Sequence, residues 1–193
     1  LERTRVSETA LFKRIYPRVD NDRKAYFCVY APDAKYVQVN CRKKYDMERQ
    51  EDGWWIGNTE PLAVGFHAAN IGGAHAGQTA VVFGAGCIGL VTLMALKAEG
   101  VSTVYVVDIL PKRLEKALEL GATQVINGKE VDAVEKIMEL TNGRGVDLAI
   151  ETAGTEFTAR QCLYATNKGA TVVFVGYSAS GEMTLPHSQI MDK

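Results

Sequence analysis

The alternation of hydrophobic and polar positions changes character near residue 60. From there onward, short continuous apolar runs alternate with longer segments in which apolar residues recur at helical spacing. Continuous runs of this length are typical of parallel strands buried on both faces, with helices as the connections. The pattern predicts a doubly wound α/β domain whose parallel strands lie at residues 79–83, 104–107, 124–126, 146–150 and 170–175.

Four helical segments are predicted between these strands. Proline opens one of them and glycine follows two of them, as is usual at helix ends. A third carries its apolar residues along one side. The segments are expected at residues 90–99, 111–120, 131–140 and 158–166.

Before residue 60 the pattern is different, because short stretches rich in β-branched and aromatic residues are separated by turn residues. Strands are expected at residues 12–16, 25–30, 36–41 and 54–56. The second and third, joined by the turn-like residues 31–34, are expected to pair as antiparallel neighbours. Several short strands with turns between them predict a β-sandwich.

Composition supports a division at the same place. Residues 1–59 hold 12 Lys+Arg against 9 Asp+Glu, 9 of the 16 aromatic residues and only 2 of the 18 glycines. Residues 60–193 hold 10 basic and 14 acidic residues. We therefore expect two domains, one spanning 1–59 and the other 60–193.

The charge and the cysteines exclude several classes of function. The 193 residues carry a net charge of −1, which argues against a nucleic-acid partner or a polybasic membrane surface. No apolar run approaches the ~18 residues of a membrane-spanning helix. Cys28, Cys41, Cys87 and Cys162 lack the CxxC spacing of zinc or redox sites, so we expect free thiols in a cytoplasmic protein.

A glycine pattern follows the first strand of the second domain. Gly84, Gly86 and Gly89 precede a predicted helix, and Asp108 ends the next strand 19 residues after Gly89. This context is typical of a dinucleotide-binding turn: the first glycine permits the tight turn, the second admits a pyrophosphate and the third allows close packing. Asp108 would bind the adenosine ribose and repel a 2′-phosphate, which favours NAD over NADP. A plain glycine turn with a surface aspartate is the alternative.

Residues 60–193 resemble the coenzyme-binding domain of zinc-dependent medium-chain alcohol dehydrogenases, within them the sorbitol and xylitol dehydrogenase branch. The residues that carry the resemblance are Glu60-Pro-Leu-Ala-Val-Gly-Phe-His67, Gly72-Gly-Ala-His-Ala-Gly77, Gly84 to Gly89, Val106-Val-Asp108, Arg113-Leu114, Leu120-Gly-Ala-Thr123, Gly143-Arg-Gly-Val-Asp147, Glu151-Thr-Ala-Gly154 and Val175-Gly-Tyr177. The resemblance implies a Rossmann domain that binds NAD(H), in an enzyme that transfers hydride between a small polyol and NAD.

The resemblance also implies where the coenzyme lies. Ile88 would pack near the pyrophosphate and ribose, Asp108 would hold the adenosine ribose, and Arg113 would lie along that ribose. The nicotinamide end would be lined by Ala153, Gly154, Val175, Gly176 and Tyr177. Cys87 stands where the family often carries proline or another small residue, so we expect it to pack in the turn and not to act as a nucleophile.

The same resemblance bears on zinc. Glu60 matches a family glutamate beside the catalytic zinc, but the cysteine and the His-Glu pair that hold this metal in the family have no match. His67, His75 and His187 are too far apart in sequence for a local ligand pair, and we expect surface or core histidines. We therefore expect no bound zinc, an incomplete catalytic site, and a domain that stops before the family's last strand and helix.

The first unit resembles a different family. Phe27-Cys-Val-Tyr-Ala-Pro-Asp-Ala-Lys35, Val37-Gln-Val39, Tyr45-Asp-Met-Glu-Arg49 and Gly53-Trp-Trp55 are similar to the immunoglobulin-like module before the catalytic domain of bacterial feruloyl and xylan esterases. The resemblance covers about residues 10–66 and implies a sandwich lacking at least one closing strand. Trp54 and Trp55 could stack on a sugar ring; the alternative, which we favour, places one in the core and the other over its edge.

Both resemblances meet at Pro61-Leu62 and Gly65-Phe66-His67, which suggests a chimera joined through local similarity. Three hypotheses for function follow. The chain is the NAD-binding portion of a polyol dehydrogenase, or a carbohydrate-associated module of an esterase, or an inert chimera without a ligand. The sequence does not decide the oligomeric state or the individual polyol.

Overall fold

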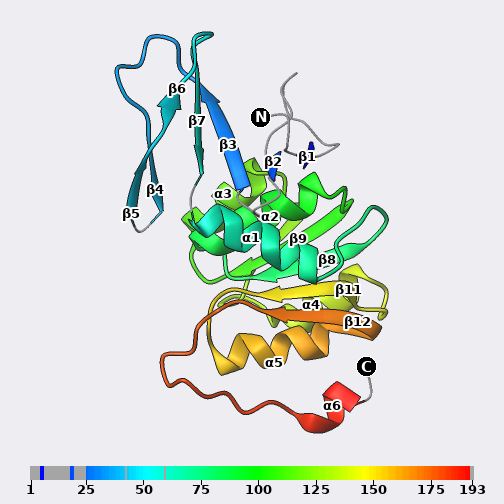
Figure 1. Ribbon diagram of the computed structural model, residues 1–193. Coiled ribbons are helices and arrows are strands. Elements are labelled where there is room, and N and C mark those ends of the chain that lie inside the picture. Colours follow the sequence, from blue (N-terminus) through cyan, green and yellow to red (C-terminus); the bar gives the residue numbers. More distant parts are fainter. Residues whose placement is uncertain (1–4, 7–17, 20–24, 42, 59, 192–193) are drawn as a thin grey trace.

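The computed structural model describes residues 5–6, 18–19, 25–41, 43–58 and 60–191. Its centre is a parallel sheet of five strands, which confirms the Rossmann-like α/β domain predicted for the second part of the chain. In spatial order the strands are β10 (Gln124–Asn127), β9 (Thr103–Asp108), β8 (Thr79–Phe83), β11 (Val146–Glu151) and β12 (Thr166–Phe174) (Figure 1). The order reverses between β8 and β11, where the chain moves from one half of the sheet to the other.

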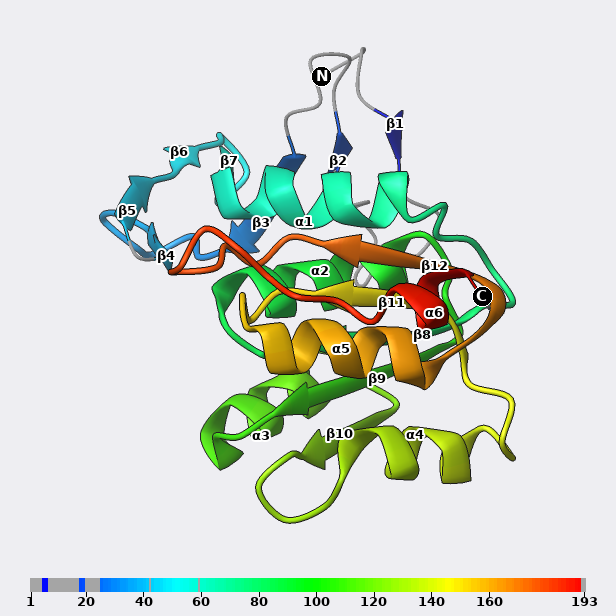
Figure 2. The ribbon, with the colours of Figure 1, turned by 90° about the horizontal axis from the view of Figure 1, so that it is seen from below.

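Helices cover both faces of this sheet (Figure 2). They are α1 (Glu60–Ile71), α2 (Cys87–Ala98), α3 (Pro111–Glu119), α4 (Ala133–Leu140), α5 (Glu156–Ala165) and the short α6 (His187–Met191). Successive strand residues point to opposite faces. Ala80 and Val82 of β8 pack in a core with residues of α1, α2 and α3, whereas Val81 and Phe83 pack in a second core with α4 and α5.

Helix α1 was not predicted from the sequence. Pro61 stands in its first turn, and Leu62, Phe66 and Ala69 are buried at helical spacing. These are helix signals, although Gly65 in the middle is unfavourable for a helix. The structure explains this glycine: a Cβ there would lie 2.9 Å from the backbone nitrogen of Thr92, so the missing side chain lets α1 approach α2 closely.

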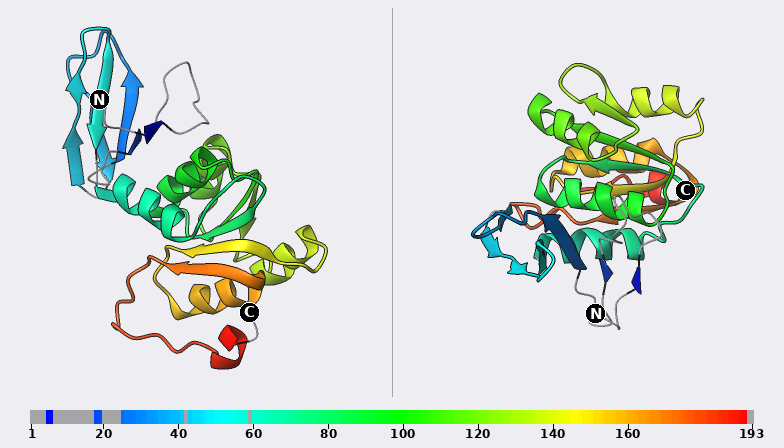
Figure 3. Two further views of the ribbon diagram at one scale, coloured as in Figure 1. Left: turned by 45° about the vertical axis from the view of Figure 1, so that its right-hand side comes forward. Right: turned by 90° about the horizontal axis from the view of Figure 1, so that it is seen from above.

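The elements described before residue 59 are all strands and pair antiparallel. They are β1 (Arg5–Val6), β2 (Arg18–Val19), β3 (Ala25–Tyr30), β4 (Gln38–Cys41), β5 (Lys43–Asp46), β6 (Glu48–Arg49) and β7 (Trp54–Asn58). One sheet has the order β1-β2-β3-β7-β6, and β4 and β5 form a separate pair. Figure 3 shows β3 to β7 standing beyond the α1 side of the α/β unit, away from α4 and α5.

The predicted pairing of 25–30 with 36–41 is wrong. Strand β3 pairs with β7 instead, and β4 pairs with β5. The reason lies at Ala31, the first residue after β3, which is hydrogen-bonded to β7 and to the turn before it. The N–H of Ala31 donates to the carbonyl of Gly53, and the indole N–H of Trp55 donates to the carbonyl of Ala31. The strand predicted at 12–16 lies outside the described residues.

The two tryptophans of β7 do not form one aromatic surface. Trp55 is only 6% exposed, its Nε1 lies 2.9 Å from the oxygen of Ala31, and the guanidinium of Arg49 lies over its ring at 5.9 Å. Trp54 is half-buried and, as the adjacent strand residue, points to the other side. The interpretation of one tryptophan as core is therefore confirmed, and a two-ring platform for a sugar is excluded by the geometry.

No helix within the described ranges is long and apolar enough to cross a membrane.

Candidate functional site: the glycine turn and the carboxyl ends of the strands

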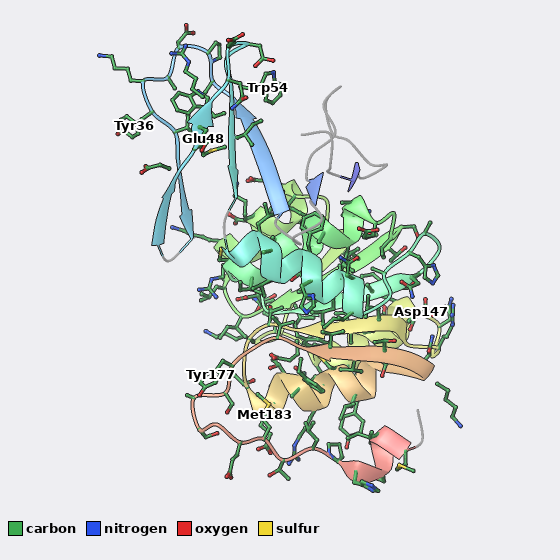
Figure 4. The ribbon with its side chains drawn as sticks, viewed as in Figure 1. Tyr36, Glu48, Trp54, Asp147, Tyr177 and Met183 are labelled. Atoms are coloured by element: carbon green, nitrogen blue, oxygen red, sulfur yellow. The ribbon has the colours of Figure 1, made fainter. Side chains whose placement is uncertain are left out.

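The candidate site lies at the carboxyl ends of β8 and β11. Because the strand order reverses between them, the loops that leave these two strands diverge to opposite faces and leave a crevice, which is where ligands bind in open α/β sheets. Figure 4 shows Tyr177 on the loop after β12, whereas Asp147, near the start of β11, lies at the opposite end of the strands. All the residues predicted to bind the coenzyme belong to strand ends, to the loops that follow them or to the first turns of α2 and α3.

The three glycines after β8 have three distinct geometries. Gly84 adopts φ +102°, a left-handed conformation that permits the turn, and its N–H donates to the carbonyl of Val107. A Cβ on Gly89 would overlap the carbonyl oxygen of Gly84, so only glycine lets α2 start this close to the strand. A Cβ on Gly86 would meet nothing within 4 Å. The fold thus requires glycine at positions 84 and 89, whereas the space beside Gly86 is open.

The first turn of α2 offers backbone donors to that open space. Gly86 is the N-cap residue, so no side chain caps the helix, and its first turn holds no acidic residue. Uncapped N–H groups and the helix dipole together favour an anion at such an end. Cys87 and Ile88 follow in this turn and are both half-buried, and Cys87 forms no disulfide bond with a described residue.

Asp108 connects the glycine turn to the end of β9. Its Oδ2 accepts a hydrogen bond from the N–H of Ala85 at 2.7 Å, and its Oδ1 accepts from the N–H groups of Ile109 and Leu110 at 2.8 and 2.9 Å. Arg113 at the start of α3 places Nη1 3.7 Å from Oδ2. The structure therefore brings together the glycine turn, Asp108 and Arg113, and their binding of a coenzyme stays a prediction.

The second group of predicted residues meets on the other side of the crevice. Gly154 adopts φ +74°, and a Cβ there would overlap the carbonyl of Tyr177. A Cβ on Gly176 would likewise overlap the N–H of Gly154. The loop after β11 and the loop after β12 are therefore in direct contact, which places Ala153 and Gly154 beside Val175, Gly176 and Tyr177. The Tyr177 side chain itself is 88% exposed.

Glu151 holds this second group together, and sequence reasoning did not single it out as a functional residue. Its Oε1 accepts hydrogen bonds from the N–H of Ala153, the N–H of Gly154 and the hydroxyl of Thr158, at 2.8 to 2.9 Å. Its backbone carbonyl accepts from the N–H groups of Val175 and Gly176. The available signal was a carboxylate that directly follows the buried apolar run 146–150.

The Glu151 side chain is completely buried, and its Oε2 has no hydrogen-bond partner among the described residues. Its neighbour Cys162 of α5 is buried on the same face of the sheet. Burial raises the pKa of the Cys162 thiol well above its usual value, and the negative charge of Glu151 raises it further. Cys162 is therefore an inert thiol, as expected for a buried cysteine.

Zinc does not fit the part of the chain that the structure describes. Those residues include no group of three or more His, Cys, Asp or Glu side chains that could hold a metal ion. Glu60 begins α1, but its side chain is not among those described. His67, His75 and His187 are all exposed, so of the two predicted placements, surface or core, the structure shows the surface one.

A family model described as zinc-binding dehydrogenase matches residues 87–193, more than half of the chain. The chain therefore belongs to the zinc-binding dehydrogenase family. Proteins of this family use a nicotinamide coenzyme and zinc.

Sorbitol dehydrogenases are among the most similar curated proteins. That of Bacillus subtilis is 41% identical over 126 residues, covering 65% of this chain and 36% of that protein. That of Ovis aries is 37% identical over 168 residues, covering 82% of this chain and 46% of that protein. The chain thus spans about a third to a half of the length of these relatives. The second alignment covers 82% of the chain, which is more than residues 60–193 make up, so the similarity continues into the residues before 60.

Solved structures show the same similarity. A zinc-binding dehydrogenase from Sinorhizobium meliloti bound to NADP superposes with a TM-score of 0.65 at 32% identity, covering 68% of this chain and 40% of that one. L-Idonate 5-dehydrogenase from Escherichia coli superposes with a TM-score of 0.62 at 29% identity, covering 68% and 37%.

The geometry predicts that alanine at two glycines of the turn lowers the free energy of unfolding by very different amounts. Gly89→Ala should lower the free energy of unfolding by about 3 kcal/mol or more, because its Cβ overlaps a backbone oxygen that cannot move without opening the turn. Gly86→Ala should change it by less than about 1 kcal/mol, since the added methyl meets open space and φ is −71°. Urea unfolding followed by circular dichroism measures both. Equal losses would contradict the distinct roles assigned to the two glycines.

Proposed function

We propose that this chain is the NAD-binding portion of a zinc-type polyol dehydrogenase. The observation that carries the proposal is the open, uncapped start of α2 at Gly86, held beside the buried carboxylate of Asp108. In this proposal the pyrophosphate lies against the first N–H groups of α2, with Cys87 and Ile88 beside it.

The arrangement around Asp108 favours NAD over NADP. Among the described residues Oδ2 accepts one hydrogen bond, from Ala85, so it keeps a lone pair for a ribose hydroxyl. A 2′-phosphate at the same place would be repelled by the carboxylate. Arg113 could instead attract that phosphate, but its guanidinium is turned toward Asp108 and half of its side chain is in solvent. The preference therefore depends on the contact between the ribose and the Asp108 carboxylate, and the preferred coenzyme is NAD.

The nicotinamide would lie at the second group of loops. Gly154, Gly176 and the backbone of Tyr177 form a wall that hydrogen bonds to Glu151 keep in place. The absence of side chains at the two glycines lets the loops approach each other and leaves peptide groups as the available contacts. The chain's own residues thus bind and orient the coenzyme.

The whole-enzyme reaction that we propose is hydride transfer between a secondary alcohol of a polyol and NAD. Support for the polyol comes from the identity to sorbitol dehydrogenases at 41% and 37%. In the whole enzyme zinc would polarise the alcohol oxygen. Since the described residues do not fit that metal, no catalytic step is assigned to this chain, and we propose that it binds coenzyme with little or no turnover.

We further propose that the chain divides at residues 59 and 60, with an immunoglobulin-like unit in front. Support comes from the described elements, which are only strands up to Asn58 and begin their first helix at Glu60. The similarity of 82% of the chain to one sorbitol dehydrogenase argues against placing a chimeric junction at this boundary. The buried Trp55 gives no support to a carbohydrate-binding function for this unit.

Asp108→Ala should weaken NAD binding about tenfold or more and reduce the preference for NAD over NADP, because one hydrogen-bonding and repulsive carboxylate is removed. Calorimetric titration with both coenzymes measures this. The matched control is Glu115→Ala, which removes the same charge from the exposed side of α3. Unchanged selectivity in Asp108→Ala would show that the adenosine ribose lies elsewhere.

Gly86→Val should abolish detectable coenzyme binding while the protein remains folded. The valine side chain would fill the space beside the start of α2, and its Cβ touches no protein atom within 4 Å, so the loss reports blocked ligand space. NADH fluorescence titration and thermal unfolding are measured on the same sample. Wild-type affinity in the folded variant would contradict the proposed place of the pyrophosphate.

A further inference from the structure

The Glu151 carboxylate is buried and has no cationic partner in the described part of the chain. None of the ion pairs found among the described residues includes it, and its side chain has no exposed surface. Hydrogen bonds stabilise one oxygen, Oε1, whereas Oε2 receives none from the described residues. A buried charge left in this state is expensive, so its position calls for an explanation beyond local packing.

The position of the charge is defined by its neighbours. Glu151 ends β11 in register with Phe83 of β8 and Phe174 of β12. Its Oε2 lies so close to the backbone of Gly176 that a Cβ there would overlap it. The carboxylate therefore lies directly behind the wall formed by the Gly154 and Gly176 loops. Because both residues are glycines, this wall is backbone alone at these two positions.

The charge acts on its surroundings with little screening. The raised pKa of the Cys162 thiol comes first from burial and then from repulsion by Glu151. Water does not reach either group, and charge interactions inside a protein are several times stronger than in bulk water. A cation on the far side of a thin glycine wall would experience the same field with the opposite sign.

Resting on the proposed coenzyme site, we propose that Glu151 makes this crevice select the oxidised coenzyme over the reduced one. The nicotinamide ring of NAD⁺ carries a positive charge, and the dihydronicotinamide ring of NADH does not. A fixed negative charge behind the nicotinamide wall attracts only the first. Glu151 acts through space and through the loops it positions; it is a selectivity residue and touches no reacting atom.

The test compares three ligands that share the adenosine diphosphate ribose portion: NAD⁺, NADH and ADP-ribose. Glu151→Gln keeps a carbonyl oxygen for the three donors at Oε1 and removes the charge. We expect the ratio Kd(NADH)/Kd(NAD⁺) to fall about three- to tenfold, the effect of one charge across several ångströms of protein. The Kd for ADP-ribose should stay within about twofold. A purely structural role would weaken the two dinucleotides together and leave their ratio unchanged.

Glu156→Gln is the matched control. It removes the same charge from the first turn of α5, but Glu156 is about half exposed and pairs with Arg160, so its charge is screened. We expect an unchanged ratio in this variant. A fall equal to that of Glu151→Gln would assign the effect to overall charge and overturn the proposal.

The outcomes separate this inference from the proposed function. Wild-type protein that binds none of the three ligands overturns coenzyme binding, and the selectivity with it. Binding of all three with an unchanged ratio in Glu151→Gln overturns only the selectivity.

If Glu151→Gln does not fold, wild-type protein is titrated with benzamide adenine dinucleotide, whose ring is neutral. At least about threefold tighter binding of NAD⁺ supports the proposal, and equal binding overturns it.

Discussion

Backbone N–H groups that follow buried parallel strands must find acceptors away from water, and in this domain two carboxylates supply them. Asp108 at the end of β9 accepts from Ala85, Ile109 and Leu110, and so joins two loops. Glu151 at the end of β11 accepts from Ala153 and Gly154 with its side chain, and from Val175 and Gly176 with its backbone. The crevice between β8 and β11 is built from these two sets of hydrogen bonds, because they determine where every loop around it lies.

The two carboxylates differ in what remains available to a ligand. Asp108 has an arginine nearby and keeps a lone pair toward the crevice, which suits it for a neutral sugar hydroxyl. Glu151 is buried behind two glycine loops and has no cationic partner among the described residues, so it acts on a ligand through its charge and through the loops that it positions. Hydrogen bonding thus belongs to one half of the crevice and electrostatic selection to the other. Both roles follow from where each strand ends.

Much of the α/β fold could be predicted because continuous apolar runs and glycine or proline at helix ends are local signals. Helix α1 was missed because Gly65, a helix-breaking residue in isolation, is required by the close approach of α2. The pairing of β3 was wrong because the partner of a strand depends on distant contacts, here those of Ala31 with Gly53 and Trp55. In the site, the motif around Gly84 and Asp108 was predictable from spacing, whereas the role of Glu151 depends on burial and on the loop after β12, which no local pattern reveals.

Amide hydrogen exchange measured with and without NAD⁺ tests the central claim most directly, because it reports both whether the coenzyme binds and where. The account predicts slower exchange in two segments, 84–89 at the start of α2 and the paired loops at 153–154 and 175–177, with no change in β3 to β7. Slower exchange confined to the first unit, or no change in any segment at millimolar NAD⁺, would contradict it.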